Sequence, residues 1–330
     1  MIYNRPEYWL ARTETVASYL TFSSPNSFTL ATGDATKHWD GTLEYSTDTS
    51  TWSTWDGTTT LSSATSGSDN VLYLRGTGNT VIGYYDAADT EDYIPWKING
   101  TDVRCDGNIE TLLDYATVEA GQHPTMAKRC FGGLFQDCTS LTQAPALPAT
   151  TLANRCYQDM FYGCTSLTQA PALPATTLAD DCYENMFWGC ASLTQAPALL
   201  AVTLATYCYS GMFQGCTSLT QAPSLPATTL GVACYLGMFQ DCTSLTQVPA
   251  LPATTLETDC YSGMFRGCTS LKLSSAQTGE YTQEYHIPSS GTGTTTTGAL
   301  LDMFTGTGGT FAGTPEINTT YYLSNTNTVV

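Results

Sequence analysis

Cysteine is the residue type with the most chemical potential in this sequence of 330 residues, which holds 13 of them. Twelve stand in pairs eight residues apart, and each pair returns after 26 residues, as Cys156 and Cys164 do in Cys182 and Cys190. Thiols can form disulfides, bind zinc or act as nucleophiles. However, eight residues of helix span about 12 Å, which is beyond disulfide reach. The sequence also has no Cys-x-x-Cys, and its three histidines do not stand at zinc-site spacing.

The cysteine spacing therefore favours two columns of buried thiols that act as small apolar side chains. Disulfides between neighbouring units, or a metal ion, are the alternatives. Cys105 lies outside the pattern, and we expect it to be buried too. Free thiols in this number suit synthesis in a reducing cytosol or life in an anaerobic niche. We predict no metal and no cofactor.

Motifs for enzymatic chemistry are not found in the sequence. It holds no glycine-rich phosphate loop, no Gly-x-Ser-x-Gly and no His-Glu-x-x-His. His123 and His286 each lie near an end of the repeats, with no evident nucleophile. Paired carboxylates for glycoside cleavage stay open, because they are often distant in the chain. We expect no enzyme and no catalytic residue, with a carbohydrate-active enzyme as the alternative.

The cysteines are positioned by a repeat of 26 residues, which in one copy reads CYQDMFYGCTSLTQAPALPATTL. Cys156, Met160 and Cys164 are spaced i, i+4, i+8, which predicts one face of a short helix. Gly163 stands where that helix would end. The following segment is expected to be extended, because its two prolines forbid a helix. Copies begin at Cys130, Cys156, Cys182, Cys208, Cys234 and, truncated, at Cys260.

One unit cannot bury its own apolar face, whereas stacked units can align their Leu, Met and Phe residues in a continuous core. The segment MFYGCTSLTQAPALP resembles the BspA-like leucine-rich repeats of bacterial surface proteins, whose units read roughly AF-x-x-C-x-x-L-x-x-I-x-I-P. The resemblance covers Cys130 to Leu271. This chain differs by Met-Phe in place of Ala-Phe and by a longer unit with a second proline. The family implies a right-handed solenoid with a short-strand sheet on one face, and roles in adhesion and partner binding.

The expected fold is thus a mixed α/β repeat solenoid, leucine-rich-repeat-like, with a short strand plus a short helix per 26-residue unit, preceded by a small all-β sandwich domain. Residues 1–15 form an N-terminal segment and residues 16–100 the sandwich. Residues 101–129 form an N-terminal cap with a helical stretch at 107–114. Residues 130–273 hold the repeats. Residues 274–330 form a loop, centred on 289–298, and a capping repeat in which Met303-Phe304 imitates the Met-Phe pair.

Short alternating or β-branched stretches at 19–22, 27–30, 42–45, 71–75 and 81–84 predict the strands of the sandwich. This region resembles the β-sandwich modules that precede such repeats in gut bacterial surface and phage tail proteins. Asp48 is expected to bond the backbone of a hairpin turn. Trp52 and Trp55 are candidates for stacking on a glycan, with a place in the core or rim of the sandwich, shared by Trp39, as the alternative.

The charge balance of 11 Lys+Arg against 29 Asp+Glu, net −18, argues against nucleic acid and anionic membranes as partners. No apolar run of about 18 residues predicts a membrane span, so no membrane insertion is expected. The first 20 residues lack the apolar core of a signal peptide. Either a signal has been removed or none is used, and a virion protein made in the cytosol would fit the second case.

Two kinds of position are candidates for binding: those at which the repeats differ from one another, and one at which every full repeat has the same polar residue. The position two before the second cysteine varies most and includes Tyr162, Trp188 and Arg266, while Tyr207 varies before a first cysteine. An aromatic patch of this kind could anchor a partner, whereas solvated positions free to drift are the alternative. A uniform glutamine column suits a repetitive ligand such as a glycan: Gln143, Gln169, Gln195, Gln221 and Gln247.

The sequence thus predicts a binding or adhesion protein that recognises a host or cell-surface protein or glycan. Its expected location is extracellular-facing, on a bacterial surface or on a phage virion. The alternative is a structural tail component or spacer without its own ligand, as a homo-oligomer or part of a virion assembly.

Overall fold

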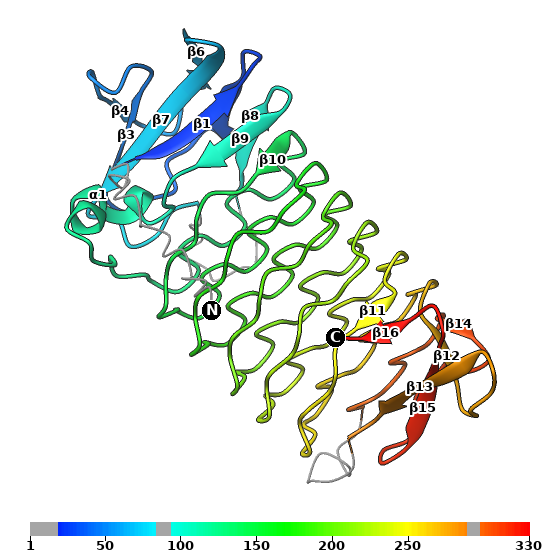
Figure 1. Ribbon diagram of the computed structural model, residues 1–330. Helices are drawn as coiled ribbons and strands as arrows, with labels where there is room; N and C mark the ends of the chain where they lie inside the picture. Colours follow the sequence, from blue (N-terminus) through cyan, green and yellow to red (C-terminus); the bar gives the residue numbers. More distant parts are fainter. Residues whose placement is uncertain (1–18, 84–93, 289–297) are drawn as a thin grey trace, which may run out of the picture.

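The computed structural model describes residues 19–83, 94–288 and 298–330, and its three parts lie in a row (Figure 1). A pair of β-sheets stands at one end, a stack of parallel coils follows, and a small sheet closes the other end. The described residues are mostly β or turn, with a single helix. The predictions for the segment 1–15, for a signal peptide, for Tyr84 and for the loop at 289–297 fall outside the described residues.

The N-terminal region contains two sheets, antiparallel except at one edge of the larger, that pack through aromatic side chains. Phe22 and Trp55 of the larger sheet contact Trp96 of the smaller one, with ring centroids 6.5 and 5.5 Å apart. The larger sheet has the order β10 (Leu141–Gln143), β9 (Val103–Asp106), β1 (Leu20–Ser24), β7 (Asp69–Thr77), β3 (Thr42–Ser46), β4 (Ser53–Trp55), with β6 (Ala64–Ser66) also on β7. The smaller has the order β5 (Leu61–Ser62), β2 (Thr29–Thr32), β8 (Trp96–Asn99).

The stretches predicted as strands at 19–22, 27–30, 42–45 and 71–75 correspond to β1, β2, β3 and β7. The fifth, at 81–84, is reduced to one bridge between Ile82 and Trp39. The Asp48 prediction is confirmed, because its carboxylate accepts hydrogen bonds from the backbone N–H groups of Ser50 and Thr51, both at 2.9 Å. These bonds lower the pKa of Asp48 to about 2.

Helix α1 (Thr111–Glu119) follows β9 in the chain and overlaps the stretch predicted to be helical. The helix packs against β7 at Gly76. A Cβ at Gly76 would stand 1.7 Å from the carbonyl oxygen of Leu112, so only glycine permits this close approach.

The prediction of a short helix in each unit is wrong. The residues between the two cysteines form a chain of tight turns, which we call the turn ribbon (155–163 in the second coil). Its N–H groups alternate between two partners: Met160 donates to Tyr157 O, three residues back, and Phe161 donates across to Met186 O of the next coil. Every fourth residue is left-handed, with φ of 59° at Arg155, 54° at Asp159 and 70° at Gly163. Repeated left-handed residues and bonds to a neighbour exclude an α-helix.

The remainder of each coil, which we call the return path, runs extended and pairs sparsely with its neighbours. Parallel bridges join Gln169 to Gln195 and Gln221 to Gln247, and others join the threonine turns further along. The strand predicted per unit is therefore shortened to single bridges over most of the stack. Strands of two or three residues, β11 (Gln247–Val248) and β10, occur only near its ends.

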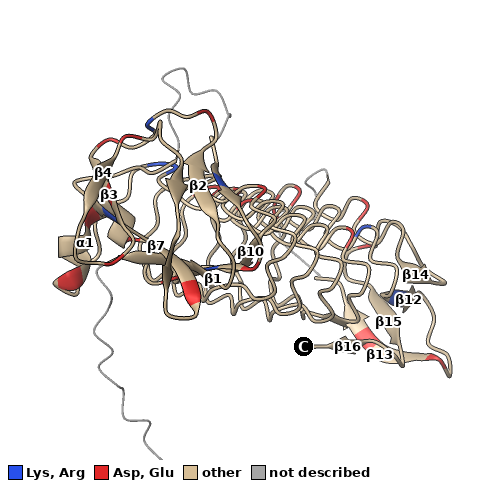
Figure 2. Cartoon of the chain, turned by 90° about the horizontal axis from the view of Figure 1, so that it is seen from above, with Lys and Arg blue, Asp and Glu red and all other residues tan. Residues whose placement is uncertain are grey.

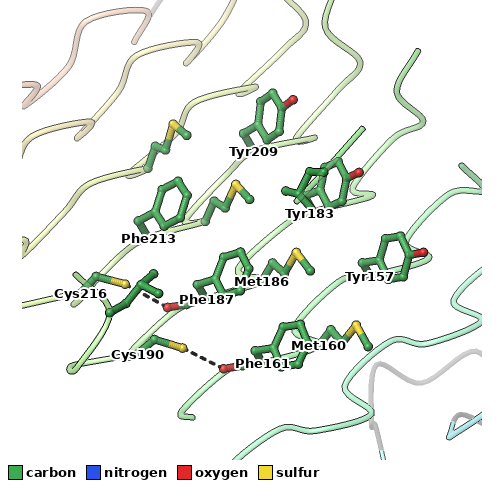
Figure 3. Close-up of a cluster of buried hydrophobic side chains, with 14 of the residues drawn as sticks. Tyr157, Met160, Phe161, Tyr183, Met186, Phe187, Cys190, Tyr209, Phe213 and Cys216 are labelled. Atoms are coloured by element: carbon green, nitrogen blue, oxygen red, sulfur yellow. Dashed lines mark hydrogen bonds between the residues drawn. The ribbon is translucent and has the colours of Figure 1, made fainter. Parts of the chain in front are cut away.

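The core of the stack consists of columns in which a side chain packs on its own counterpart one coil away. Phe161 and Phe187 lie parallel with centroids 5.6 Å apart, and Tyr157 and Tyr183 lie 5.8 Å apart (Figure 3). The methionines and cysteines of the unit are buried beside them, as are its leucines at positions such as Leu167 and Leu173. Phe22 and Phe135 lie 6.2 Å apart, so this core is continuous with that of the sheets.

A seventh turn ribbon without cysteines ends the stack. Phe304 stacks on Phe265 at 5.7 Å, and Phe265 donates its N–H to Met303 O as in the other coils. A sheet then covers the core in the order β13 (Tyr281–His286), β15 (Thr320–Ser324), β12 (Lys272–Ser274), β14 (Gly308–Gly309). The last strand, β16 (Thr328–Val329), returns to pair in parallel with β11.

Candidate functional site: a groove along the turn ribbons

The thiols are placed for packing and not for chemistry. All 13 cysteines are free and buried. The second thiol of a coil donates to a carbonyl of the preceding coil, as from Cys190 Sγ to Phe161 O at 3.1 Å (Figure 3). Burial raises the pKa of Cys138 and of Cys190 to about 12, so thiolates do not form near neutral pH. Within the described parts of the chain, no cluster of three or more His, Cys, Asp or Glu side chains could hold a metal ion.

A first hollow lies beside the N-terminal cap and holds a histidine–carboxylate pair. His123 Nδ1 is 2.8 Å from Glu110 Oε2, the histidine side chain is 51% exposed and the carboxylate 1%. The hollow measures about 370 Å³ and includes Thr150 and Thr151. Among the described residues, the imidazole bonds only to Glu110, so no hydroxyl or thiol is held as a nucleophile. The pair therefore joins two segments of the N-terminal cap beside the first return path.

A second hollow runs along the outer face of the turn ribbons and measures about 550 Å³. It crosses five successive ribbons, from the one that holds Trp188 to the cysteine-free ribbon that holds Leu301. Trp188, Gln214, Gln240 and Arg266 form one wall, one residue from each of the first four ribbons. The opposite wall is formed by the equivalent column of Glu184, Ser210, Leu236, Ser262 and Leu301.

The groove includes two of the residues predicted to bind a partner, Trp188 and Arg266. Tyr162 does not line it, but its ring lies 5.6 Å from that of Trp188 and supports the indole from the neighbouring ribbon. Tyr207 stands at a left-handed position before the first cysteine of its coil and does not line the groove. The predicted aromatic patch is therefore reduced to a pair.

The glutamine column lies away from the groove, on the return path. Gln143, Gln169, Gln195 and Gln221 are exposed there, and Gln247 is half-buried beneath β16. The sequence thus grouped residues from two different sides of the coil as one set of candidates, and the structure separates them.

The two tryptophans considered for glycan stacking are both engaged. Trp55 is 1% exposed and packs between Trp39 and Trp96, so it cannot reach a sugar, and here the core alternative is correct. Trp52 is half-buried, with the Arg75 guanidinium 4.1 Å from its ring centroid. A cation–π contact of this kind occupies one face of the indole.

The sequence alone did not assign a role to the column that forms the floor of the groove: Asn185, Gly211, Gly237, Gly263 and Asp302. The sequence did contain a signal for this column, because in the coils with cysteines its residues stand three positions after the first cysteine, as Asn185 does after Cys182. Because the segment was interpreted as a short helix, glycine there indicated only the end of that helix and not a surface column.

Charge along the groove is mixed and low. Glu184 and Asp302 stand near its ends and Arg266 lies between them. Burial raises the pKa of Glu184 to about 7, with further contributions from Asp181 and Asp159. In Figure 2, basic residues lie scattered among more numerous acidic ones, which is unlike the basic stripe that phosphate backbones require. Over the ranges that the structure describes, no helix is long and apolar enough to cross a bilayer.

Comparison with known proteins adds no relative: no protein-family model, no curated protein and no solved structure matches this chain.

Proposed function

We propose that this chain is a non-enzymatic binding protein, a leucine-rich-repeat-like solenoid of the BspA-like type that recognises a protein or glycan on a cell surface. It would act from a bacterial surface or a phage tail. The observation that carries the proposal is the contrast between columns. Inward-facing Cys, Tyr, Met and Phe recur almost unchanged, whereas the outward column of the turn ribbons changes from Tyr162 to Trp188, Gln214, Gln240 and Arg266 and borders an open groove.

Repeat stacks present extended surfaces of this kind for recognition. The packing supports a core that takes no part in chemistry, since the thiols are buried and protonated and the His123–Glu110 pair at the cap holds no nucleophile. The experiment is a screen of the labelled full chain on glycan and cell-surface-protein arrays. We expect saturable binding to at least one probe, with no change in the size of any glycan after prolonged incubation. Cleavage of a glycan would favour a carbohydrate-active enzyme instead.

A structural spacer is the second candidate, and one observation favours it. The core of the stack continues into the N-terminal sheets through Phe22, Phe135 and Trp96, so the two parts are joined by packing and not by a linker. Such a joint suits a rod that holds a module at a distance. Light scattering on the purified chain separates the candidates. A trimer or larger particle that binds no array probe would support the spacer and contradict the binding protein.

A further inference from the structure

The floor of the groove on the turn ribbons is made largely of glycine, although the fold does not require glycine there. Gly211, Gly237 and Gly263 occupy it in three successive coils, with φ of 59°, 58° and 61°. The same column holds Asp159, Asn185 and Asp302 in other coils, with φ of 54°, 52° and 56°, and glycine again at Gly133 in the first coil, with φ of 61°. Because Asn and Asp adopt this left-handed conformation readily, the backbone alone does not demand glycine.

Packing inside the molecule does not demand glycine at two of these positions either. A Cβ at Gly237 would meet its nearest atom, the Gln240 Oε1, at 3.5 Å, and a Cβ at Gly263 would meet Gln240 Oε1 at 3.8 Å. These are ordinary van der Waals distances. The missing side chains therefore leave space on the outside of the molecule, where asparagine or aspartate would otherwise stand in the groove.

From this geometry we infer that the glycine-floored groove binds a linear, largely neutral oligosaccharide, which sharpens the proposed function and rests on it. Trp188 offers an aromatic platform at one end, supported from behind by Tyr162. Gln214 and Gln240 follow at one-coil intervals, with the Ser210 and Ser262 hydroxyls opposite. Side-chain amides, hydroxyls and an indole face are the groups that bond sugar hydroxyls and pack on the apolar face of a pyranose ring.

The size of the groove suits a short chain of sugars. Its volume of about 550 Å³ lies within the roughly 300–1,000 Å³ of ordinary ligand sites. Its length of five ribbons corresponds to roughly 20 Å if neighbouring ribbons are spaced like hydrogen-bonded strands. A ligand with a repeating unit can bond to walls whose polar groups recur at coil intervals, with amides at Gln214 and Gln240 and hydroxyls at Ser210 and Ser262.

An extended peptide fits this groove less well. Peptides that add to a sheet need unpaired backbone groups, whereas Gly237 donates its N–H to Ser262 O and accepts at its carbonyl from Gln240 N–H. The backbone N–H and carbonyl groups of Gly211 and Gly263 are hydrogen-bonded in the same manner, so the floor offers no unpaired backbone groups at these three glycines. Helical and proline-rich peptides need apolar or aromatic-lined grooves, and Leu236 and Leu301 are the only aliphatic side chains in the lining.

The test is isothermal titration calorimetry on the full chain with linear cello-, xylo-, manno-, laminari- and chito-hexaoses, and with the di- and tetrasaccharide of any binder. We expect at least one hexaose to bind, with affinity rising from the disaccharide to the tetrasaccharide. Trp188→Ala should weaken binding roughly 30-fold, the effect of losing one aromatic anchor. The double variant Gly237→Asn/Gly263→Asn should abolish binding, because it fills the floor with a residue that this column already holds at Asn185.

The matched control is Gly215→Asn. Gly215 is also left-handed, with φ of 73°, and a Cβ there would meet the Gly189 Cα at 3.6 Å, but it does not line the groove. Its thermal midpoint should fall by about half as much as that of the double variant, because it carries one such substitution and not two, and its binding should equal that of the parent chain. Should the double variant fail to fold, Gln214→Ala/Gln240→Ala, which alters only partly exposed side chains, replaces it with the same expected loss.

The outcomes separate this inference from the function on which it rests. A hexaose that binds all groove variants as tightly as the parent chain would overturn the groove assignment. Saturable binding to an array protein, unchanged in the double variant and with no hexaose bound, would also overturn it while supporting a binding protein. Binding to no probe of either kind would count against both.

Discussion

The two sides of each coil use opposite means of joining to their neighbours. On the turn ribbon, every second N–H crosses to the next coil, as from Phe187 to Met212 O at 2.9 Å, and the side chains below stack in columns. On the return path, single bridges such as that between Gln221 and Gln247 are the main backbone link. The ribbon therefore holds the stack together, and its outer face is a firm base on which side chains can vary, whereas the return path is uniform and loosely paired.

The largest effect should come from removing one ring of a ribbon column. Phe187 is fully buried and stacks on Phe161 at 5.6 Å and on Phe213 at 5.8 Å. Phe187→Ala should lower the free energy of unfolding by about 3–5 kcal/mol, because it removes ring contacts on both sides and leaves a cavity. Urea denaturation measures it, with Phe187→Leu as the control that keeps most of the volume. A loss below about 1 kcal/mol would show that the columns collapse onto a deleted ring.

Much of this side was predictable from the sequence. The repeat, its core residues and the burial of its thiols followed from spacing alone. The predicted helix was wrong, because the apolar positions Cys156, Met160 and Cys164 recur every four residues and not at the helical period of about 3.6. On a helix, the third of them would have rotated by about 80° from the first. A period of four together with Asp159 and Gly163, which tolerate positive φ, is the signature of the turn ribbon.

The groove and the ends were harder to predict. Sequence comparison of the units identified Trp188 and Arg266 as variable. Whether the position of Gly237 faces the core or the groove depends on the ribbon geometry, which the sequence does not reveal. The same comparison grouped Gln221 with Trp188 and Arg266, although it lies on the other side of the coil. The pairing of β16 with β11 joins residues about 80 positions apart through only a few bonds, as between Thr328 N–H and Thr246 O. Local patterns carry no information about such a contact.

The left-handed positions give the next largest effect, since among the described residues of the coils they lie on the ribbon and not on the return path. Gly215→Ala should cost about 1–2 kcal/mol, because an alanine Cβ is strained at the φ of 73° found there. Gly215→Asn should cost less, as asparagine tolerates this region. Urea denaturation of both variants tests the order. Equal losses would mean that contact with Gly189 in the neighbouring coil, and not backbone strain, sets the penalty.

A pH dependence should also belong to the ribbon side. The pKa of Glu184 is raised from 4.5 to about 7, chiefly by burial and then by Asp181 and Asp159, against Arg155 and a bond from Gln158. The folded state therefore binds more protons than the unfolded one between about pH 4.5 and 7, and stability falls as pH rises through this window. Glu184→Gln should remove that fall and gain about 1 kcal/mol at pH 8, less than the full shift implies because the carboxylate is partly solvated.

Unfolding by urea at pH 4.5 and pH 8 checks this, with Asp302→Asn as a control at the far end of the same groove. The parent chain and Glu184→Gln should differ less at pH 4.5 than at pH 8. An equal difference at both pH values would mean that the substitution acts through packing and not through the charge.

The smallest effect is expected on the return path. Gln221 is exposed, and among the described residues its side chain makes no hydrogen bond, while the backbone there is held by Ala222 N–H donating to Gln247 O at 2.9 Å. Gln221→Ala should therefore change the free energy of unfolding by less than about 0.5 kcal/mol, as is usual for exposed side chains without a specific partner. Stacked glutamines can nevertheless bond along a column, as they do in amyloid-like ladders. A loss above about 1 kcal/mol in urea denaturation, well outside this surface range, would show that such a ladder joins the coils on the return path and that the two sides of the stack are closer to equal.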